Sequence, residues 1–264
     1  MFFGHYISRY INLIIPKRQH PSRTVTDGLY EEEYSCYPPA VAHESTQYAT
    51  GPIATVFIYE PQRRREVWRY VTYMFVHIGA FHLVVNLLVQ ILLGVPLEMV
   101  HKWWRVLIVY FAGVLAGSLG TSIVDSSVKL AGASGGVYSL ITAHVASIIM
   151  NWKEMSYPIF QLLLFLIVAG TDIGTAIYNR YVLDINEHIG YAAHFAGALA
   201  GLLVGINILR NLSVTRHERV IWWASIVTYS LLMAMCIIWN FAWPGYFPKE
   251  VFTAQIGRNN SRRL

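Results

Sequence analysis

Four side chains in the apolar part of the chain are of the kinds that hydrolytic enzymes use. Ser134 and His194 form a candidate nucleophile and base, because a serine hydroxyl is a weak nucleophile at neutral pH and a neutral imidazole can take its proton. His82 and Asn86 are spaced i, i+4, so a helix would present both from one face as donors to a developing oxyanion. The backbone N–H of Ser134 could join them. Together these groups have the chemistry of acyl transfer.

Small and aromatic residues that could support this pair lie beside it in the sequence. They are Gly132, Gly135, Tyr138, Gly197 and Gly201. The glycines next to Ser134 suit a sharply bent, tightly packed backbone. Tyr138, one turn beyond Ser134, could hold the imidazole plane by stacking. The GxxxG pair that follows His194 would let a neighbouring helix approach closely.

Each of these residues also has a plainer interpretation. A serine that opens a helix is most often an N-cap, a histidine inside a membrane usually bonds to a neighbouring helix, and GxxxG is commonest as a packing motif. Asp172 could orient His194 as the acid of a triad, although a packing hydrogen bond or a place along a channel is the alternative for this carboxylate. The joint pattern favours chemistry, because packing residues have no reason to gather on alternate spans.

The composition places the middle of the chain in a lipid bilayer. Of 264 residues, 55% are hydrophobic and 13% charged, and the charges concentrate before residue 70 and after residue 209. A bilayer core of about 30 Å needs roughly 20 apolar residues per helix. Six windows qualify: 81–100, 103–123, 134–150, 158–178, 189–209 and 221–243. We therefore predict an all-α polytopic bundle with six spans, and the modest positive charge that flanks them does not indicate a nucleic-acid partner.

The basic residues between the windows predict the direction of the spans. The loops after the first, third and fifth windows contain Lys102, Arg105, Lys153, Arg210, Arg216 and Arg219, whereas the other two contain Lys129 and Arg180. The positive-inside rule assigns the first set to the cytosol. The first, third and fifth windows then begin on the non-cytosolic side, which brings His82, Ser134 and His194 toward one membrane surface.

The segment 60–80 is amphipathic, with three consecutive arginines before several aromatic residues, so we expect it to lie in the membrane interface, with a plain surface helix as the alternative. No HExxH-like motif is present, and the sequence predicts neither a metal nor a cofactor.

The motifs resemble those of the rhomboid intramembrane serine proteases. The resemblance lies in GASGGVYSL at 132–140, AAHFAGALAG at 192–201, HLVVN at 82–86 and the Trp-Arg pair in VWR at 67–69. It covers about residues 56–245, and the extra window at 221–243 is similar to that of the metazoan secretory-pathway members.

The resemblance implies Ser134 as nucleophile, His194 as general base and acid, and His82 with Asn86 as oxyanion donors, with no need for Asp172. It also implies single-pass membrane proteins as substrates, such as growth-factor precursors of the EGF type. The compartment it implies is the Golgi or the plasma membrane.

One departure from the family pattern is the stretch 40–55, which is too polar to cross a bilayer where these relatives have a first span. The expected organisation is a polar, poorly ordered segment at 1–55, a membrane domain at 56–245 and a polar tail at 246–264. Because a helix of the core would be missing, a non-catalytic protein that binds client transmembrane helices is the main alternative. A transporter is a third one, weakened by the lack of a visible inverted repeat.

Overall fold

The computed structural model describes residues 52–181, 190–212 and 216–248, and it consists of helices joined by short connections. Six long helices form the bundle: α4 (Gly79–His101), α5 (Trp103–Val124), α6 (Ser134–Met150), α7 (Pro158–Tyr181), α8 (Tyr191–Ile208) and α9 (Arg216–Ala242). Short helices precede and follow them: α2 (Pro52–Phe57), η1 (Pro61–Arg63), α3 (Arg69–Thr72), η2 (Tyr73–Phe75) and η3 (Pro244–Tyr246).

Each of the six predicted spans coincides with one long helix, so the all-α polytopic fold is confirmed. The helices α4, α5, α8 and α9 are long and apolar enough to cross a membrane, while α6 and the part of α7 at Pro158–Thr171 are shorter apolar helices. Many large apolar side chains of α4, α7 and α9 are exposed. Such an exposed apolar surface suits lipid, in which a helix satisfies its own backbone.

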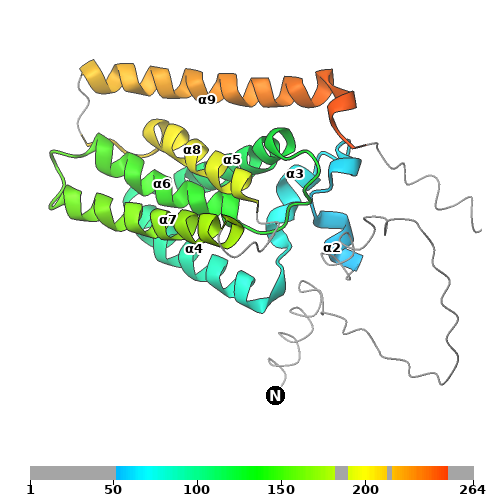
Figure 1. Cartoon of the computed structure of the whole chain (residues 1–264). Coiled ribbons are helices and arrows are strands. Elements are labelled where there is room, and N and C mark those ends of the chain that lie inside the picture. Colours follow the sequence, from blue (N-terminus) through cyan, green and yellow to red (C-terminus); the bar gives the residue numbers. More distant parts are fainter. Residues whose placement is uncertain (1–51, 182–189, 213–215, 249–264) are drawn as a thin grey trace, which may run out of the picture.

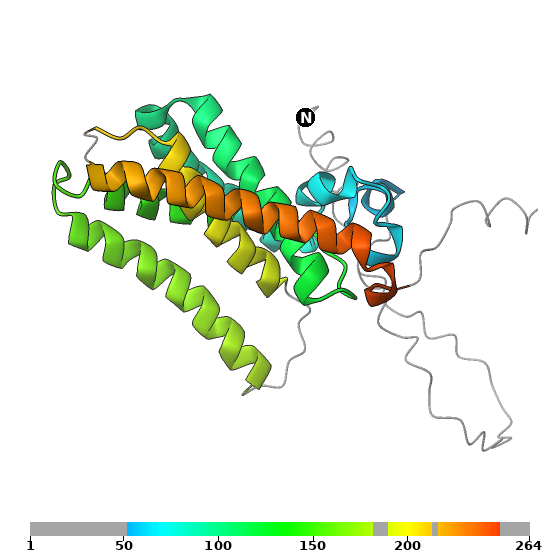
Figure 2. The same ribbon diagram turned by 90° about the horizontal axis from the view of Figure 1, so that it is seen from above.

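The centre of the bundle is formed by α5, α6 and α8, each of which packs against the other two (Figure 1). The helix α9 runs along the side formed by α5 and α8, whereas α4 and α7 lie on the other side. Figure 2 shows that α7 diverges from the other helices along its length.

Glycine allows the helices of this centre to approach one another. A Cβ atom on Gly197 of α8 would run into the backbone of Gly135 on α6, and one on Gly201 would run into the backbone of Ser139. A Cβ on Gly113 of α5 would run into the side chain of Ser139 and would lie 2.8 Å from the carbonyl oxygen of Gly135. The small residues expected beside the site therefore hold three helices in close contact.

One side-chain hydrogen bond reinforces the contact between α6 and α8. Thr142 donates from Oγ1 to the carbonyl oxygen of Ala198 at 2.6 Å. Since a hydroxyl in an apolar environment needs a partner, this bond fixes how the two helices align along their axes.

The segment before α4 folds into short helices that lie against the bundle (Figure 1). Trp68 and Phe75 are about half exposed, whereas Tyr73 and Met74 are buried. This half-apolar surface is compatible with the predicted location in the interface, which stays a prediction. The predicted segment 1–55 and the tail 246–264 fall mostly outside the described residues, so the proposed domain boundaries and the missing first span also stay predictions.

We predict that Gly197→Val prevents the close approach of α8 to α6. The added side chain meets backbone that cannot rotate away, so we expect a loss of at least about 3 kcal/mol of stability. The melting temperature of the purified protein in detergent micelles would measure it.

Gly170→Ala in α7 is the matched control, because nothing lies within 4 Å of the position of its new Cβ. Alanine has the higher helix propensity, so this variant should melt at the same temperature as the parent or slightly above it. If Gly197→Val melted like the parent, the packing account would be wrong.

Candidate active site

Ser134 is the first residue of α6 and lies half buried at its N-terminal end. The residue in the N-cap position is Ala133, whose own side chain cannot cap this helix end. The plainer interpretation of Ser134 as an N-cap is therefore wrong. Its own N–H belongs to the first turn, where backbone donors have no partner within the helix.

His194 lies in the first turn of α8, and its ring stacks on that of Tyr138 from α6. The two ring centroids are 4.5 Å apart and the planes differ by 14°. Tyr138 follows Ser134 by four residues, so both occupy the same face of α6. The stacking that the sequence predicts is thus present, and it holds the imidazole plane at the serine end of α6. Tyr191 contacts the same imidazole edge to face, with centroids 6.3 Å apart.

Gly132 connects Ser134 with His82 of α4. Its φ angle of +117° lies in a region that side chains with a Cβ rarely adopt. A Cβ built there would stand 2.8 Å from Cε1 of His82 and 3.9 Å from Oγ of Ser134. The imidazole of His82 and the hydroxyl of Ser134 thus border the same glycine, and any other residue at position 132 would separate them.

Asn86 is buried one turn below His82, and its side chain is anchored to the same helix. Its Nδ2 donates to the carbonyl oxygen of His82 at 2.8 Å. A carboxamide nitrogen has two protons, and this bond uses one of them. His82 accepts a hydrogen bond at Nδ1 from the N–H of Ile78 at 3.3 Å. In that tautomer the proton of the neutral ring is on Nε2, the nitrogen nearer Gly132.

His77 is the residue at this site that the sequence did not single out. It is buried, its Nε2 accepts a hydrogen bond from the N–H of Ala133 at 3.4 Å, and its ring meets that of His82 edge to face at 5.3 Å. The residue before Ser134 is therefore held by a side chain that precedes α4. Its spacing to His82 matches no helical repeat, because the chain turns into α4 between them.

Backbone hydrogen bonds fix the segment that leads into Ser134. Tyr59 and Leu130 form an antiparallel β-bridge with N–H to O distances of 3.1 and 3.0 Å. The N–H of Gly132 donates to the carbonyl oxygen of Tyr73 at 3.1 Å. Lys129 and Glu60 add an ion pair at 2.9 Å. The loop 59–77 thus binds the chain on the N-terminal side of the serine.

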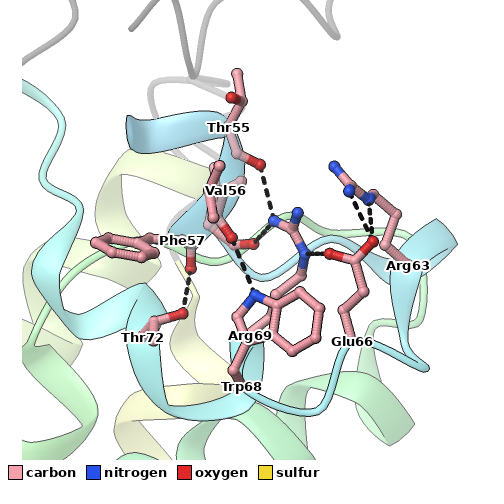
Figure 3. Close-up of polar contacts among 9 residues, drawn as sticks. Thr55, Val56, Phe57, Arg63, Glu66, Trp68, Arg69 and Thr72 are labelled. Carbon is pink, nitrogen blue, oxygen red and sulfur yellow. Dashed lines mark hydrogen bonds and ion pairs between the residues drawn. The ribbon is translucent and has the colours of Figure 1, made fainter. Parts of the chain in front are cut away.

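The arginine of the Trp-Arg pair holds this loop together from inside (Figure 3). Arg69 is 1% exposed and donates from Nη1 to the carbonyl oxygens of Thr55 at 2.9 Å and Ile58 at 2.7 Å. Its Nε donates to Glu66 at 2.7 Å. Burial alone would raise the pKa of Glu66, but hydrogen bonds from Arg69 and Arg63 lower it below its ordinary value. Glu66 therefore stays a carboxylate, as a buried arginine requires.

The remaining points concern Asp172 and groups of side chains that could bind a metal ion. The side chain of Asp172 lies outside the described residues, so its part in a triad stays a prediction. Within the residues that the structure covers, no group of three or more His, Cys, Asp or Glu side chains could hold a metal ion.

Fold and site together define a polytopic integral membrane protein whose candidate catalytic groups lie at one end of a helical bundle. The chain belongs to the rhomboid family, because the Rhomboid domain model matches residues 64–211.

Three relatives show how far this likeness extends. The chain is 41% identical over 194 residues to rhomboid-related protein 2 of Mus musculus, covering 72% of this chain and 64% of that protein. It is 35% identical over 192 residues to inactive rhomboid-related protein 2 of Caenorhabditis elegans, covering 72% and 55%. It is 27% identical over 147 residues to rhomboid-like protease 2 of Toxoplasma gondii, covering 55% and 49%. The chain thus spans about half to two thirds of the length of these relatives.

The burial of His77 predicts how stability depends on pH. Burial and the neighbouring His82 lower the pKa of His77 to about 4, below the value of about 6.5 expected in the unfolded chain. On acidification the unfolded chain binds this proton first. The contribution of His77 is therefore complete above about pH 6.5, is lost progressively as the pH falls toward 4, and changes no further below that.

His77→Gln is the matched control, because an amide oxygen can still accept from Ala133 but does not titrate. The difference in melting temperature between the parent and His77→Gln, measured in detergent from pH 7.5 to 4.5, should shift in favour of the variant as the pH falls. Parallel curves for the two proteins would contradict the assignment.

Proposed function

We propose that the chain is an intramembrane serine endopeptidase that cleaves single-pass membrane proteins within or beside their transmembrane segment. The observation that carries this proposal is the stack of Tyr138 on His194, one helical turn from Ser134. It supports a histidine oriented as a base beside a half-buried hydroxyl. Membership of a family with protease-named members supports the same activity.

In the proposed reaction, Oγ of Ser134 attacks the scissile carbonyl carbon while His194 takes the hydroxyl proton. The new C–O bond places the negative charge on the former carbonyl oxygen. His194 then returns the proton to the leaving amine, the C–N bond breaks, and a water molecule activated by the same imidazole hydrolyses the acyl-enzyme.

The developing oxyanion would lie among three donors. These are the N–H of Ser134 at the start of α6, Nε2–H of His82 and the second amide proton of Asn86. Donors fixed before the reaction stabilise charge that appears only in the transition state. Gly132 keeps His82 close enough to contribute to the oxyanion site. Gly135, Gly197 and Gly201 support the site indirectly, because they let α6 pack closely against α8.

A substrate helix has a satisfied backbone in lipid, so its scissile bond becomes accessible only where the helix unwinds. We therefore propose substrates with helix-weakening, small residues near the outer membrane boundary. By the family resemblance, precursors of EGF-like growth factors in the Golgi or plasma membrane are the proposed class.

The alternative is a non-catalytic membrane protein that binds client transmembrane helices. It is favoured by the relative named inactive, which is 35% identical to this chain over 192 residues. A protein of this kind would need a surface that contacts client helices but no nucleophile, so removing the hydroxyl at position 134 separates the two functions.

We expect Ser134→Ala and His194→Ala each to reduce cleavage of a single-pass reporter by about 10³-fold or more, because nucleophile and base act as one unit. The parent protein in proteoliposomes should also react covalently with a fluorophosphonate probe. Ser127→Ala, which alters an exposed loop serine bonded to Asp125, is the matched control and should behave like the parent. The alternative would be favoured if the parent and Ser134→Ala bound a client helix equally well while the parent neither cleaved the reporter nor reacted with the probe.

Loss of an oxyanion donor should give a different kinetic signature. His82→Ala and Asn86→Ala are each expected to lower kcat by about 10²-fold with little change in KM, because the donors act on the transition state. Labelling by the phosphonate probe should slow in parallel. An effect confined to KM would show that these side chains bind substrate instead.

A further inference from the structure

The C-terminal end of α9 makes a polar contact that the proposed chemistry does not use. Asn240 donates from Nδ2 to Oγ of Ser122 on α5 at 2.9 Å, and its Oδ1 accepts from the hydroxyl of Tyr70 at 3.2 Å. Its backbone carbonyl accepts from Nη1 of Arg64 at 3.2 Å. One residue of α9 thus connects to α5 and to the loop before α4. A carboxamide in a largely apolar helix is costly, which favours a specific role.

This contact is one of several polar contacts that hold α9 to the described bundle. Others lie nearer the opposite end, where Nδ2 of Asn207 on α8 donates to Oγ of Ser225 at 2.7 Å and Nε1 of Trp222 donates to the carbonyl oxygen of Asn207 at 3.2 Å. Between the two places, Tyr229 and Met233 of α9 pack against the hydrophobic core, whereas other large apolar side chains of the helix are exposed. The hydrogen bonds of Asn240 therefore add to apolar packing in fixing the C-terminal end of α9.

The residues that follow α9 strengthen the attachment made by Asn240. The guanidinium of Arg64 lies 3.7 Å above the ring of Phe247, and the hydroxyl of Tyr246 donates to the carbonyl oxygen of Ile123 at 2.6 Å. The end of α9 and the residues that follow it therefore cover the loop residue Arg64, which is 9% exposed.

A short series of contacts leads from Asn240 to the nucleophile. The ring of Tyr70 packs against that of Tyr59 with centroids 5.1 Å apart. Tyr59 forms the β-bridge with Leu130, which lies four residues before Ser134. The carbonyl oxygen of Tyr70 also accepts a hydrogen bond from Ser118 of α5 at 2.7 Å. Tyr70 is thus fixed by α5 and α9 on one side and supports the bridge on the other.

We propose that Asn240 is a positioning residue of the active site: by binding Tyr70 it makes α9 a support for the Tyr59–Leu130 bridge and so for Ser134. The kinetic consequence of this inference rests on the proposed protease function, whereas the structural contact between Asn240 and Tyr70 does not. The helix α9 then belongs to the catalytic unit instead of being an appended span.

The test compares Asn240→Leu and Tyr70→Phe with Ser225→Ala as the matched control. Leucine removes the carboxamide while keeping a similar volume, and phenylalanine keeps the ring contact with Tyr59. Ser225→Ala weakens the attachment of α9 to Asn207, which is far from the loop. In proteoliposomes, we expect kcat for a single-pass reporter to fall about 5-fold in the first two variants, the size of one typical hydrogen bond, with KM unchanged. Ser225→Ala should retain the parent kcat.

The double variant Asn240→Leu/Tyr70→Phe distinguishes positioning from general weakening. If both residues act through one bond, its kcat should match that of the single variants, whereas independent effects would multiply to about 25-fold. Multiplied effects, or an unchanged kcat in Asn240→Leu, would overturn the proposal.

Hydrogen exchange tests the same coupling without any activity. The N–H groups of Leu130 and Gly132 are bonded to Tyr59 and Tyr73, so they should exchange about 5-fold faster in Asn240→Leu and at the parent rate in Ser225→Ala. Unchanged exchange in Asn240→Leu would overturn the proposal even if the parent cleaves its reporter. If exchange were faster in Asn240→Leu but the parent neither cleaved its reporter nor reacted with the probe, the positioning contact would be supported and only the protease function would be refuted.

Discussion

The close approach of α6 and α8 is the contact on which the rest of the structure depends. It exists because Gly197 faces the backbone of Gly135 and Gly201 faces that of Ser139, leaving no room for side chains between the helices. Ser134 begins one of these helices and His194 lies in the first turn of the other. Backbone packing therefore decides how near the two side chains can come, and Tyr138 decides how the imidazole is turned.

The second constraint acts on the segment that enters α6. Leu130, Gly132 and Ala133 are each hydrogen-bonded to the chain between Tyr59 and His77. That chain is folded around the buried pair of Arg69 and Glu66. A loop outside the main bundle thus determines how the backbone reaches Ser134, and the Trp-Arg pair contributes through structure instead of through direct contact with the reacting groups.

Much of this arrangement could be predicted from the sequence, because membrane helices leave strong signals. The lengths of the apolar windows predicted the six helices, and the direction of the chain through them predicted that His82, Ser134 and His194 approach one membrane surface. His77 and Asn240 were missed because their partners are set by how the loop 59–77 folds, which has no periodicity. The contribution of α5 had a readable signal, since Gly113 and Gly117 have GxxxG spacing, but nothing in the pattern indicated which helix they face.

The length of α6 has a further consequence for the membrane around the protein. Its 17 residues extend for only about 25 Å, whereas a typical hydrocarbon core is about 30 Å thick. The bilayer around the bundle must therefore be locally thinner, or the polar N-terminus of α6 must sit below the headgroups. Thinning would shorten the distance that water travels to reach Ser134, whereas a sunken N-terminus would lengthen it. The thickness of the surrounding bilayer therefore becomes a variable that sets access to the serine.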